Sequence, residues 1–232
     1  MMKFWDGTLP KPGQRTVEDM RSVLADFNAC AENTLYFMYR SLSMNPGDKE
    51  WLSARCLRYD ITVIPPCLLG DEYVKTKGHY HPKAPDGFGF PELYQVISGE
   101  AHFLLQKRDL SDVVVVRAKT GDVVLVPPGY GHVTINPSNE TLVMANIVSD
   151  AFKSEYEFYE HNHGAAYYEL FGNVFLKNPN YGDVPKIRFV DAFEVPELKI
   201  LHNQSIYDLI GDDEVLEYLN NPVILEKINF KI

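Results

Sequence analysis

The most informative part of the chain reads Lys75-Thr-Lys-Gly-His-Tyr-His-Pro82, followed by Pro91-Glu-Leu-Tyr94 and Pro127-Pro-Gly-Tyr-Gly-His132. In a β-strand, side chains two residues apart share a face, so His79 and His81 can both point into one cavity. Glu92 opens the next strand, and His132 can return to the same cavity through the fold. Three imidazoles and one carboxylate suit a first-row divalent metal, namely Fe, Mn, Ni, Co or Zn.

Short β-branched runs fill the chain from about Tyr59 to Val148. Gly, Pro and Asn interrupt these runs about every ten residues, which is typical of a β-sandwich or β-barrel. Outside them we expect a helix after the N-cap residue Thr16, a strand from Leu35, and a helix over residues 205–218. The simplest organisation is a helical and strand extension at 1–50, a barrel at 51–150 and a C-terminal extension at 151–232.

Composition excludes several classes of protein. The 232 residues include 22 Lys and Arg against 32 Asp and Glu, a formal net charge of −10. This balance argues against a nucleic-acid partner, because such binding depends on Lys and Arg displacing phosphate counterions. No apolar run approaches the roughly 18 residues of a membrane helix. The N-terminus also lacks the apolar core of a secretory signal.

Cysteine usage points to a reducing compartment. The three cysteines, Cys30, Cys56 and Cys67, are odd in number and widely spaced, so we expect buried, reduced thiols. Together with the composition, this predicts a cytoplasmic protein with no membrane partner.

Each functional interpretation has a simpler alternative. An isolated His-x-His in a strand is more often a surface or hydrogen-bonded pair, and Glu92 and His132 are what favour a metal site. Thr62 and Thr76 alone would pass for ordinary strand residues. The histidines His102, His161, His163 and His202 are interpreted as structural or exposed. The lysines Lys75, Lys77 and Lys83 are interpreted mostly as solvated charge, although any of them could attract a dianion.

A longer pattern resembles the cupin-type glucose-6-phosphate isomerases over roughly residues 60–150. It reads Thr62-Val-Ile, Gly70-Asp-Glu-Tyr-Val-Lys-Thr-Lys-Gly-His-Tyr-His81, Glu92-Leu-Tyr94 and Val126-Pro-Pro-Gly-Tyr-Gly-His132. The resemblance implies a double-stranded β-helix, the cupin jelly-roll barrel, usually as a homodimer. It also implies a metal-dependent isomerase of glucose 6-phosphate and fructose 6-phosphate, at a step of glycolysis and gluconeogenesis. Fe²⁺ is the preferred metal, with Mn²⁺, Zn²⁺, Ni²⁺ and Co²⁺ as alternatives.

The resemblance also assigns residues. It implies that the metal ligands are His79, His81, Glu92 and His132. It implies that the substrate contacts are Tyr36, Thr62, Thr76, Gly78 and Tyr94, and that the catalytic residues are Glu92 and Tyr156. The chain departs from the family pattern at Ser154, where the pattern has His, and at Val148, where it has Tyr.

The assigned roles leave one conformational problem. Strict strand alternation would place Thr76 and Gly78 on the face opposite the histidines. A bulge or tight bend at Gly78 would reconcile the two sets, and a glycine within a strand often marks such a bend.

The mechanism has two interpretations. Glu92 can move a proton between C1 and C2 through an enediol, a role worth about 10²–10⁴ in rate. A metal-bound carboxylate is a weaker base than a free one, so a hydride shift is the rival. Two other functions stay open: another phosphosugar isomerase or epimerase, acting for example on mannose 6-phosphate, and a non-catalytic sugar-binding cupin.

Overall fold

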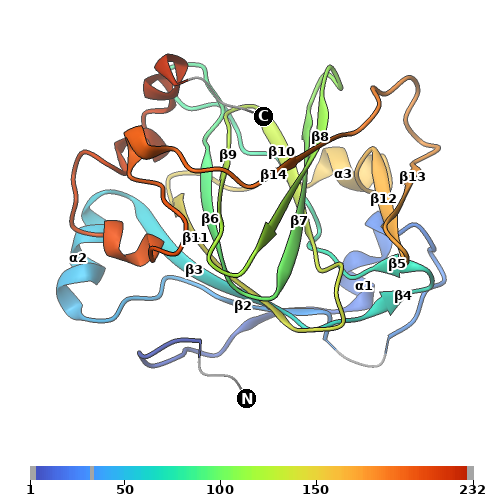
Figure 1. Ribbon diagram of the computed structural model, residues 1–232, viewed down its shortest axis with the longest axis horizontal. Helices are drawn as coiled ribbons and strands as arrows, with labels where there is room; N and C mark the ends of the chain where they lie inside the picture. The colour runs from blue at the N-terminus through green and yellow to red at the C-terminus, as the bar shows by residue number, and fades with distance from the viewer. Residues whose placement is uncertain (1–3, 32–33, 229–232) are drawn as a thin grey trace.

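Two β-sheets enclose the core of the computed structural model, which describes residues 4–31 and 34–228 (Figure 1). The six-stranded sheet has the order β1 (Gly13–Arg15), β2 (Tyr36–Tyr39), β3 (Leu57–Ile64), β11 (Leu142–Ser149), β6 (Glu92–Ser98) and β9 (Val123–Val126). The second sheet has four strands in the order β10 (Tyr130–Ile135), β7 (Glu100–Lys107), β8 (Val113–Lys119) and β14 (Arg188–Asp191). The predicted mainly β fold is confirmed, although the described strands do not close into one continuous ring.

A third, smaller sheet lies at the end of the molecule that also carries α1 (Val17–Met20) and α3 (Glu157–His161), as Figure 1 shows. Its order is β13 (Val174–Lys177), β12 (Tyr167–Leu170), β5 (Glu72–Tyr73) and β4 (Leu68–Leu69). The opposite end carries α2 (Pro46–Ala54) and much of the C-terminal segment. Within the described ranges, no helix has the length and apolarity that crossing a membrane requires.

Strand periodicity builds one core on each face of the six-stranded sheet. On β6, Leu93 packs in the outer cluster and Tyr94 in the cluster between the two sheets. On β11, Val143 faces outward and Met144 inward in the same way. The C-terminal segment covers the outer cluster with Val195, Leu198, Ile200, Ile206, Val215, Leu216, Tyr218, Leu219 and Leu225. The C-terminal extension therefore shields the outer face of the sheet from water.

The extensions contain less helix than the sequence pattern predicts. Thr16 is the expected N-cap and forms a capping box with Asp19, but α1 ends at Met20 and continues only as a 3₁₀ turn, Arg21–Val23. The predicted helix over 205–218 is wrong. Gly211 adopts a φ of 102°, which ends helical geometry there and separates two 3₁₀ segments. The 3₁₀ segments of the tail are Pro196–Leu198, Ile206–Leu209, Glu217–Leu219 and Pro222–Lys227.

The cysteines also differ from expectation. All three are free thiols as predicted, but Cys30 and Cys56 are exposed and Cys67 is half-buried. Cys56 has a φ of 50° in the turn after α2, so it belongs to a surface turn and not to a core. The predicted division of the chain at residues 50 and 150 stays a prediction.

Lys75 is buried, which corrects its interpretation as a solvated charge. It forms an ion pair with Glu72, and both side chains are at most 5% exposed. The Glu72 carboxylate also accepts a hydrogen bond from the Ala25 amide at 2.9 Å, and the Lys75 ammonium lies 4.8 Å from the ring centre of Tyr168. The pair ties the small sheet to the N-terminal segment. Lys83, by contrast, is exposed as predicted.

We predict that Lys75→Met lowers the free energy of unfolding by about 3–5 kcal/mol, because it leaves the buried Glu72 charge without its partner. Lys83→Met is the matched control and should change this free energy by less than about 0.5 kcal/mol. Urea unfolding of both variants measures the difference. Equal stability of the two variants would show that the buried pair contributes nothing.

Candidate functional site

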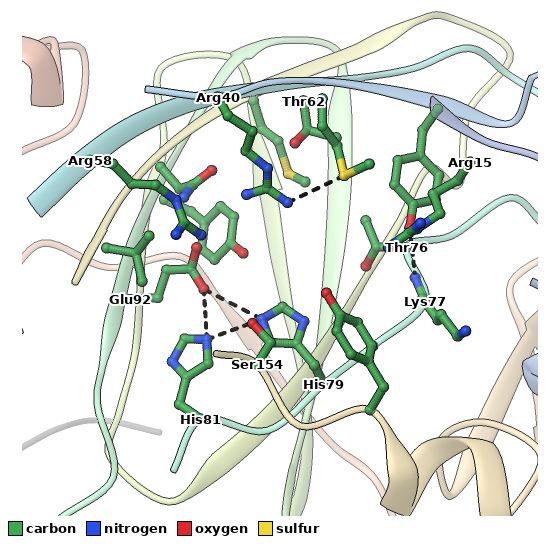
Figure 2. Close-up of a pocket in the computed structure, with 18 residues that line it drawn as sticks. Arg15, Arg40, Arg58, Thr62, Thr76, Lys77, His79, His81, Glu92 and Ser154 are labelled. Atoms are coloured by element: carbon green, nitrogen blue, oxygen red, sulfur yellow. Dashed lines mark hydrogen bonds and ion pairs between the residues drawn. The ribbon is translucent and has the colours of Figure 1, made fainter. Parts of the chain in front are cut away.

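Three paired strands build one wall of a cavity (Figure 2). In the β6–β11–β3 ladder, Glu92 pairs with Val148, which in turn pairs with Arg58. The next inward-facing row is Tyr94, Asn146 and Asp60. A third row aligns Met144, Thr62 and Met38. Because alternate residues of a strand share a face, this register directs polar side chains far apart in sequence toward one another.

Gly78 lets the opposite wall present both the threonine and the histidines. The segment from Lys75 to His81 forms no regular strand and contacts β10 through isolated bridges, one of which joins His79 to His132. Gly78 has a φ of 77°, and a Cβ there would lie 2.6 Å from Val133 Cγ2. This left-handed bend breaks the alternation, so Thr76, Gly78, His79 and His81 all line the cavity.

Four predicted ligands converge at one end of the cavity. One ligand atom from each of His79, His81, Glu92 and His132 lies within 4.8 Å of all the others. Glu92 Oε2 lies 3.3 Å from His81 Nε2, 3.2 Å from His132 Nε2 and 4.0 Å from His79 Nε2. The structure thus brings together the constellation that the sequence predicts.

Neighbouring groups orient these ligands. His81 Nδ1 donates to the Phe90 carbonyl at 2.9 Å, which leaves Nε2 as the nitrogen with a free lone pair. The Tyr94 hydroxyl lies 3.1 Å from His132 Nε2, beside the ligand cluster. Burial, together with the nearby Glu92 charge, raises the pKa of Tyr94 well above its usual value, so this hydroxyl keeps its proton.

The protonation states suit metal binding. Burial and the neighbouring imidazoles lower the pKa of His79 well below its usual value, and burial lowers the pKa of His132. Burial opposes ionisation of Glu92, but the close approach of the His132 and His81 rings outweighs it and lowers the pKa of the carboxyl. Metal ligands must be deprotonated, and these three shifts all favour the deprotonated form.

The donor set fits a first-row divalent ion. The carboxylate oxygen Glu92 Oε2 is buried and has no hydrogen-bond partner among the described residues, which is costly unless a cation lies beside it. Three imidazole nitrogens converge on the same oxygen. A cation bound between these atoms would satisfy all four groups at once.

The other end of the cavity carries the predicted substrate contacts. Tyr36 and Thr62 come from β2 and β3, and Thr76 and Gly78 from the bent segment. Tyr36 accepts a hydrogen bond from the Lys77 amide at 3.2 Å, and burial raises the pKa of Tyr36 to about 12. Thr76 Oγ1 accepts from the Thr134 amide at 2.9 Å, which leaves the Thr76 hydroxyl proton available to a ligand.

Tyr156 also lies in the cavity, at the start of α3. Its ring centre is 5.5 Å from that of His79 and 5.8 Å from the Lys77 ammonium. It therefore stands between the two ends of the site. Both departures from the family pattern, Val148 and Ser154, line the same cavity.

Sequence reasoning missed three arginines and underrated one lysine. Arg15, Arg40 and Arg58 line the cavity, as does Lys77, which pairs with Glu160 at 2.6 Å. Arg58 could have been found, because it lies four residues before Thr62 in the same predicted strand and its side chain therefore shares a face with Thr62. Arg15 could not, because only the β1–β2 ladder places it opposite Tyr36.

Charge distinguishes this cavity from the rest of the molecule. Its lining contains four permanent cations, Arg15, Arg40, Arg58 and Lys77, and one carboxylate, Glu92. The whole chain has a formal charge of −10. Figure 2 shows Arg15 and Lys77 on the side opposite Glu92 and His81. The arrangement suits an anionic small molecule that reaches from a cationic subsite to a metal.

Comparisons with known proteins agree with this description. The family model described as Glucose-6-phosphate isomerase (GPI) matches residues 12–186. A glucose-6-phosphate isomerase of Thermococcus onnurineus is 36% identical over 91 residues, which cover 39% of this chain and 46% of that protein. One from Pyrococcus abyssi is 32% identical over 149 residues, which cover 62% of this chain and 74% of that protein. The chain thus spans about half the length of the first relatives that it matches.

A solved structure also matches in part. It is the formate complex of Lactobacillus farciminis oxalate decarboxylase, at 20% identity and a TM-score of 0.39. The match covers 53% of this chain and 31% of that chain.

We predict that the purified protein binds about one divalent metal ion per chain, and that His79→Ala and His132→Ala each weaken this binding at least about 100-fold. Loss of an outer partner of a metal ligand already costs about 10–100-fold, so loss of a ligand costs more. His202→Ala is the control, since His202 faces Asp122 outside the cluster. Elemental analysis after dialysis gives the metal content, and full occupancy in both ligand variants would refute the site.

Proposed function

Because the chain belongs to the glucose-6-phosphate isomerase family, we propose that it interconverts glucose 6-phosphate and fructose 6-phosphate with a bound divalent metal. The observation that carries this proposal is one cavity with two chemically different ends. A cluster of three imidazoles and a carboxylate lies at one end, and a cationic subsite lies at the other. An aldose phosphate requires both ends at once.

The cationic subsite would hold the phosphate. Arg15 has a buried Nε without a partner among the described residues, and Lys77 adds a second charge. The hydroxyls of Tyr36, Thr62 and Thr76 supply donors, and the absence of a Cβ at Gly78 lets an oxygen approach the backbone. These groups offset the repulsion of an anion by the overall charge of the chain.

The ligand end would carry the proton transfer. His79, His81, Glu92 and His132 would hold a divalent ion, which supplies Lewis acidity when it is bound. Glu92 Oε2 is the oxygen in contact with the three imidazoles, so we assign to Oε1 the transfer of a proton from C2 to C1. Tyr94 lies beside His132 at the edge of the ligand cluster, and Tyr156 is placed to contact the sugar between the two ends.

The finer features of this proposal rest on the family and the donor set. We propose Fe²⁺ as the preferred ion, with Mn²⁺, Zn²⁺, Ni²⁺ or Co²⁺ as alternatives, since nitrogen and carboxylate ligands suit all of them. We also propose a homodimer in the cytoplasm, with sugar phosphates as partners and neither nucleic acid nor membrane. The acidic chain and the cationic cavity support a small anionic ligand.

A panel assay tests the reaction against its alternatives. Metal-loaded protein is offered glucose 6-phosphate, fructose 6-phosphate, mannose 6-phosphate and unphosphorylated glucose. The proposal requires interconversion of the first two and no turnover of glucose. Val148 and Ser154, which depart from the family pattern, keep a mannose 6-phosphate activity open. Binding without turnover would instead indicate a sugar-binding cupin.

We predict that Glu92→Gln lowers kcat per bound metal ion by about 100-fold or more, because the amide keeps the volume of the side chain but loses its basicity. The same variant should stop exchanging the C2 proton of the substrate with solvent deuterium. Turnover is normalised to metal content so that loss of metal does not imitate loss of the base. Wild-type turnover per metal ion would favour the hydride shift, with Glu92 serving only as a ligand.

We predict that Arg15→Met raises KM for glucose 6-phosphate about 10-fold or more and leaves kcat nearly unchanged. A hydrogen bond to a charged group contributes about 1.5–3 kcal/mol, and the phosphate keeps this contact throughout the reaction. Arg117→Met is the control, because Arg117 pairs with Asp191 on the surface. An unchanged KM would remove Arg15 from the phosphate subsite.

A further inference from the structure

We infer that Arg40 binds the reacting end of the substrate and favours the negative charge that develops on the C1 and C2 oxygens. This inference rests on the proposed isomerase function and deepens it. Arg40 follows β2 and lines the cavity. In Figure 2 it stands between Arg58 and Thr62, above Glu92 and the histidines.

A buried carboxylate fixes Arg40 in place. Asp60 is fully buried on β3, and its Oδ2 accepts from Arg40 Nη1 at 2.6 Å and from Arg58 Nε at 2.8 Å. Its Oδ1 accepts from the Ser41 amide at 2.9 Å, so the turn that carries Arg40 is bound to the same group. One carboxylate therefore orders two guanidinium groups and the adjacent backbone.

The two arginines are not compensated equally. Arg58 has a second carboxylate partner, Asp150, at 2.7 Å from its Nη1. The second nitrogen of Arg40, Nη2, donates only to the Met38 sulfur at 3.3 Å, and a thioether is a weak acceptor. The Arg40 side chain is 45% exposed, whereas Asp60 is fully buried. Of these two arginines, Arg40 is therefore the one whose second nitrogen has no carboxylate partner among the described residues.

That charge acts on the ligand end of the cavity. Asp60, which holds Arg40, pairs through Asn146 with Tyr94 in one row of the sheet, and Tyr94 contacts His132. Arg40 lines the same cavity as His79 and Glu92. The guanidinium therefore lies within electrostatic range of the ligand cluster.

The chemistry of the reaction needs a cation there. Removing the C2 proton leaves an enediolate, whose C1 and C2 oxygens share a plane and carry negative charge. A guanidinium presents planar, paired N–H donors that match two such oxygens. A preorganised donor acts most strongly where charge develops, because it requires no rearrangement during the reaction. Neither Val148 nor Ser154, on the same cavity, carries a charge.

Two ligands isolate this contact without relying on turnover. Gluconate 6-phosphate and glucitol 6-phosphate share the carbon chain and the phosphate, but only the first carries a planar anion at C1. Their dissociation constants are measured by calorimetry on the metal-loaded full-length protein. We expect Arg40→Met to reduce the preference for gluconate 6-phosphate by about 10- to 100-fold, the effect of losing a hydrogen bond to a charged group. Glucitol 6-phosphate should bind as before.

Two further variants separate binding from folding. Arg40→Lys keeps the charge but loses the planar fork, so it should retain part of the preference. Arg117→Met removes a surface arginine and should match the wild type in both affinities. Thermal unfolding and metal content show whether each variant is intact, and Asp60 keeps its bond to Arg58 when Arg40 is replaced.

The outcomes distinguish this inference from the proposed function. An unchanged preference in Arg40→Met, an equal loss of affinity for both ligands, or no preference in the wild type would each overturn the role of Arg40. Isomerase activity is measured in parallel on the wild type. One outcome would refute the isomerase proposal and still support the anion contact. In it, the wild type does not isomerise glucose 6-phosphate but prefers gluconate 6-phosphate, and Arg40→Met lacks this preference.

Discussion

The site depends on the pairing of β11 with β3 on one side and β6 on the other. That register places Glu92, Val148 and Arg58 in one row and Tyr94, Asn146 and Asp60 in the next. A slip of one residue in either ladder would turn the inward set of that strand into the outer apolar cluster. Such a slip is strongly disfavoured because both faces of this sheet are packed, one by the second sheet and one by the C-terminal segment. The C-terminal segment, which shields the outer face of the sheet from water, thus also stabilises the strand register that shapes the cavity.

The ligand end of the site could be predicted because its information is local. His79 and His81 lie two residues apart, and Glu92 and His132 stand in short recognisable motifs. Strand alternation alone does not predict the bend at Gly78, but the conflict between the two sets of assigned contacts does. The position of Gly78 against Val133 and Tyr159 explains why a glycine stands there.

The cationic residues could not be predicted to the same degree. Arg15 and Arg40 reach the cavity from β1 and from the turn after β2, and only long-range strand pairing brings these segments beside β3. Lys75 and Lys77 look alike in the sequence, yet one forms a buried pair with Glu72 and the other lines the cavity. The sequence pattern mispredicts the C-terminal tail for a related reason. Its apolar residues recur at helical spacing, but their burial against the sheet, together with the left-handed Gly211, holds them in short 3₁₀ turns.

Two buried carboxylates, Asp60 and Glu92, have different partners: Asp60 accepts from the arginines and Glu92 faces the histidines. Glu92 lines the same cavity as Arg40 and Arg58, so without Asp60 these guanidinium groups would compete with the imidazoles for the Glu92 carboxylate. Asp60 accepts from both arginines and leaves Glu92 to the three histidines. The cost of burying a second charge is offset by three hydrogen bonds to Asp60. An acidic chain can therefore hold a cationic cavity beside a carboxylate ligand, because the excess positive charge is anchored one residue row away from it.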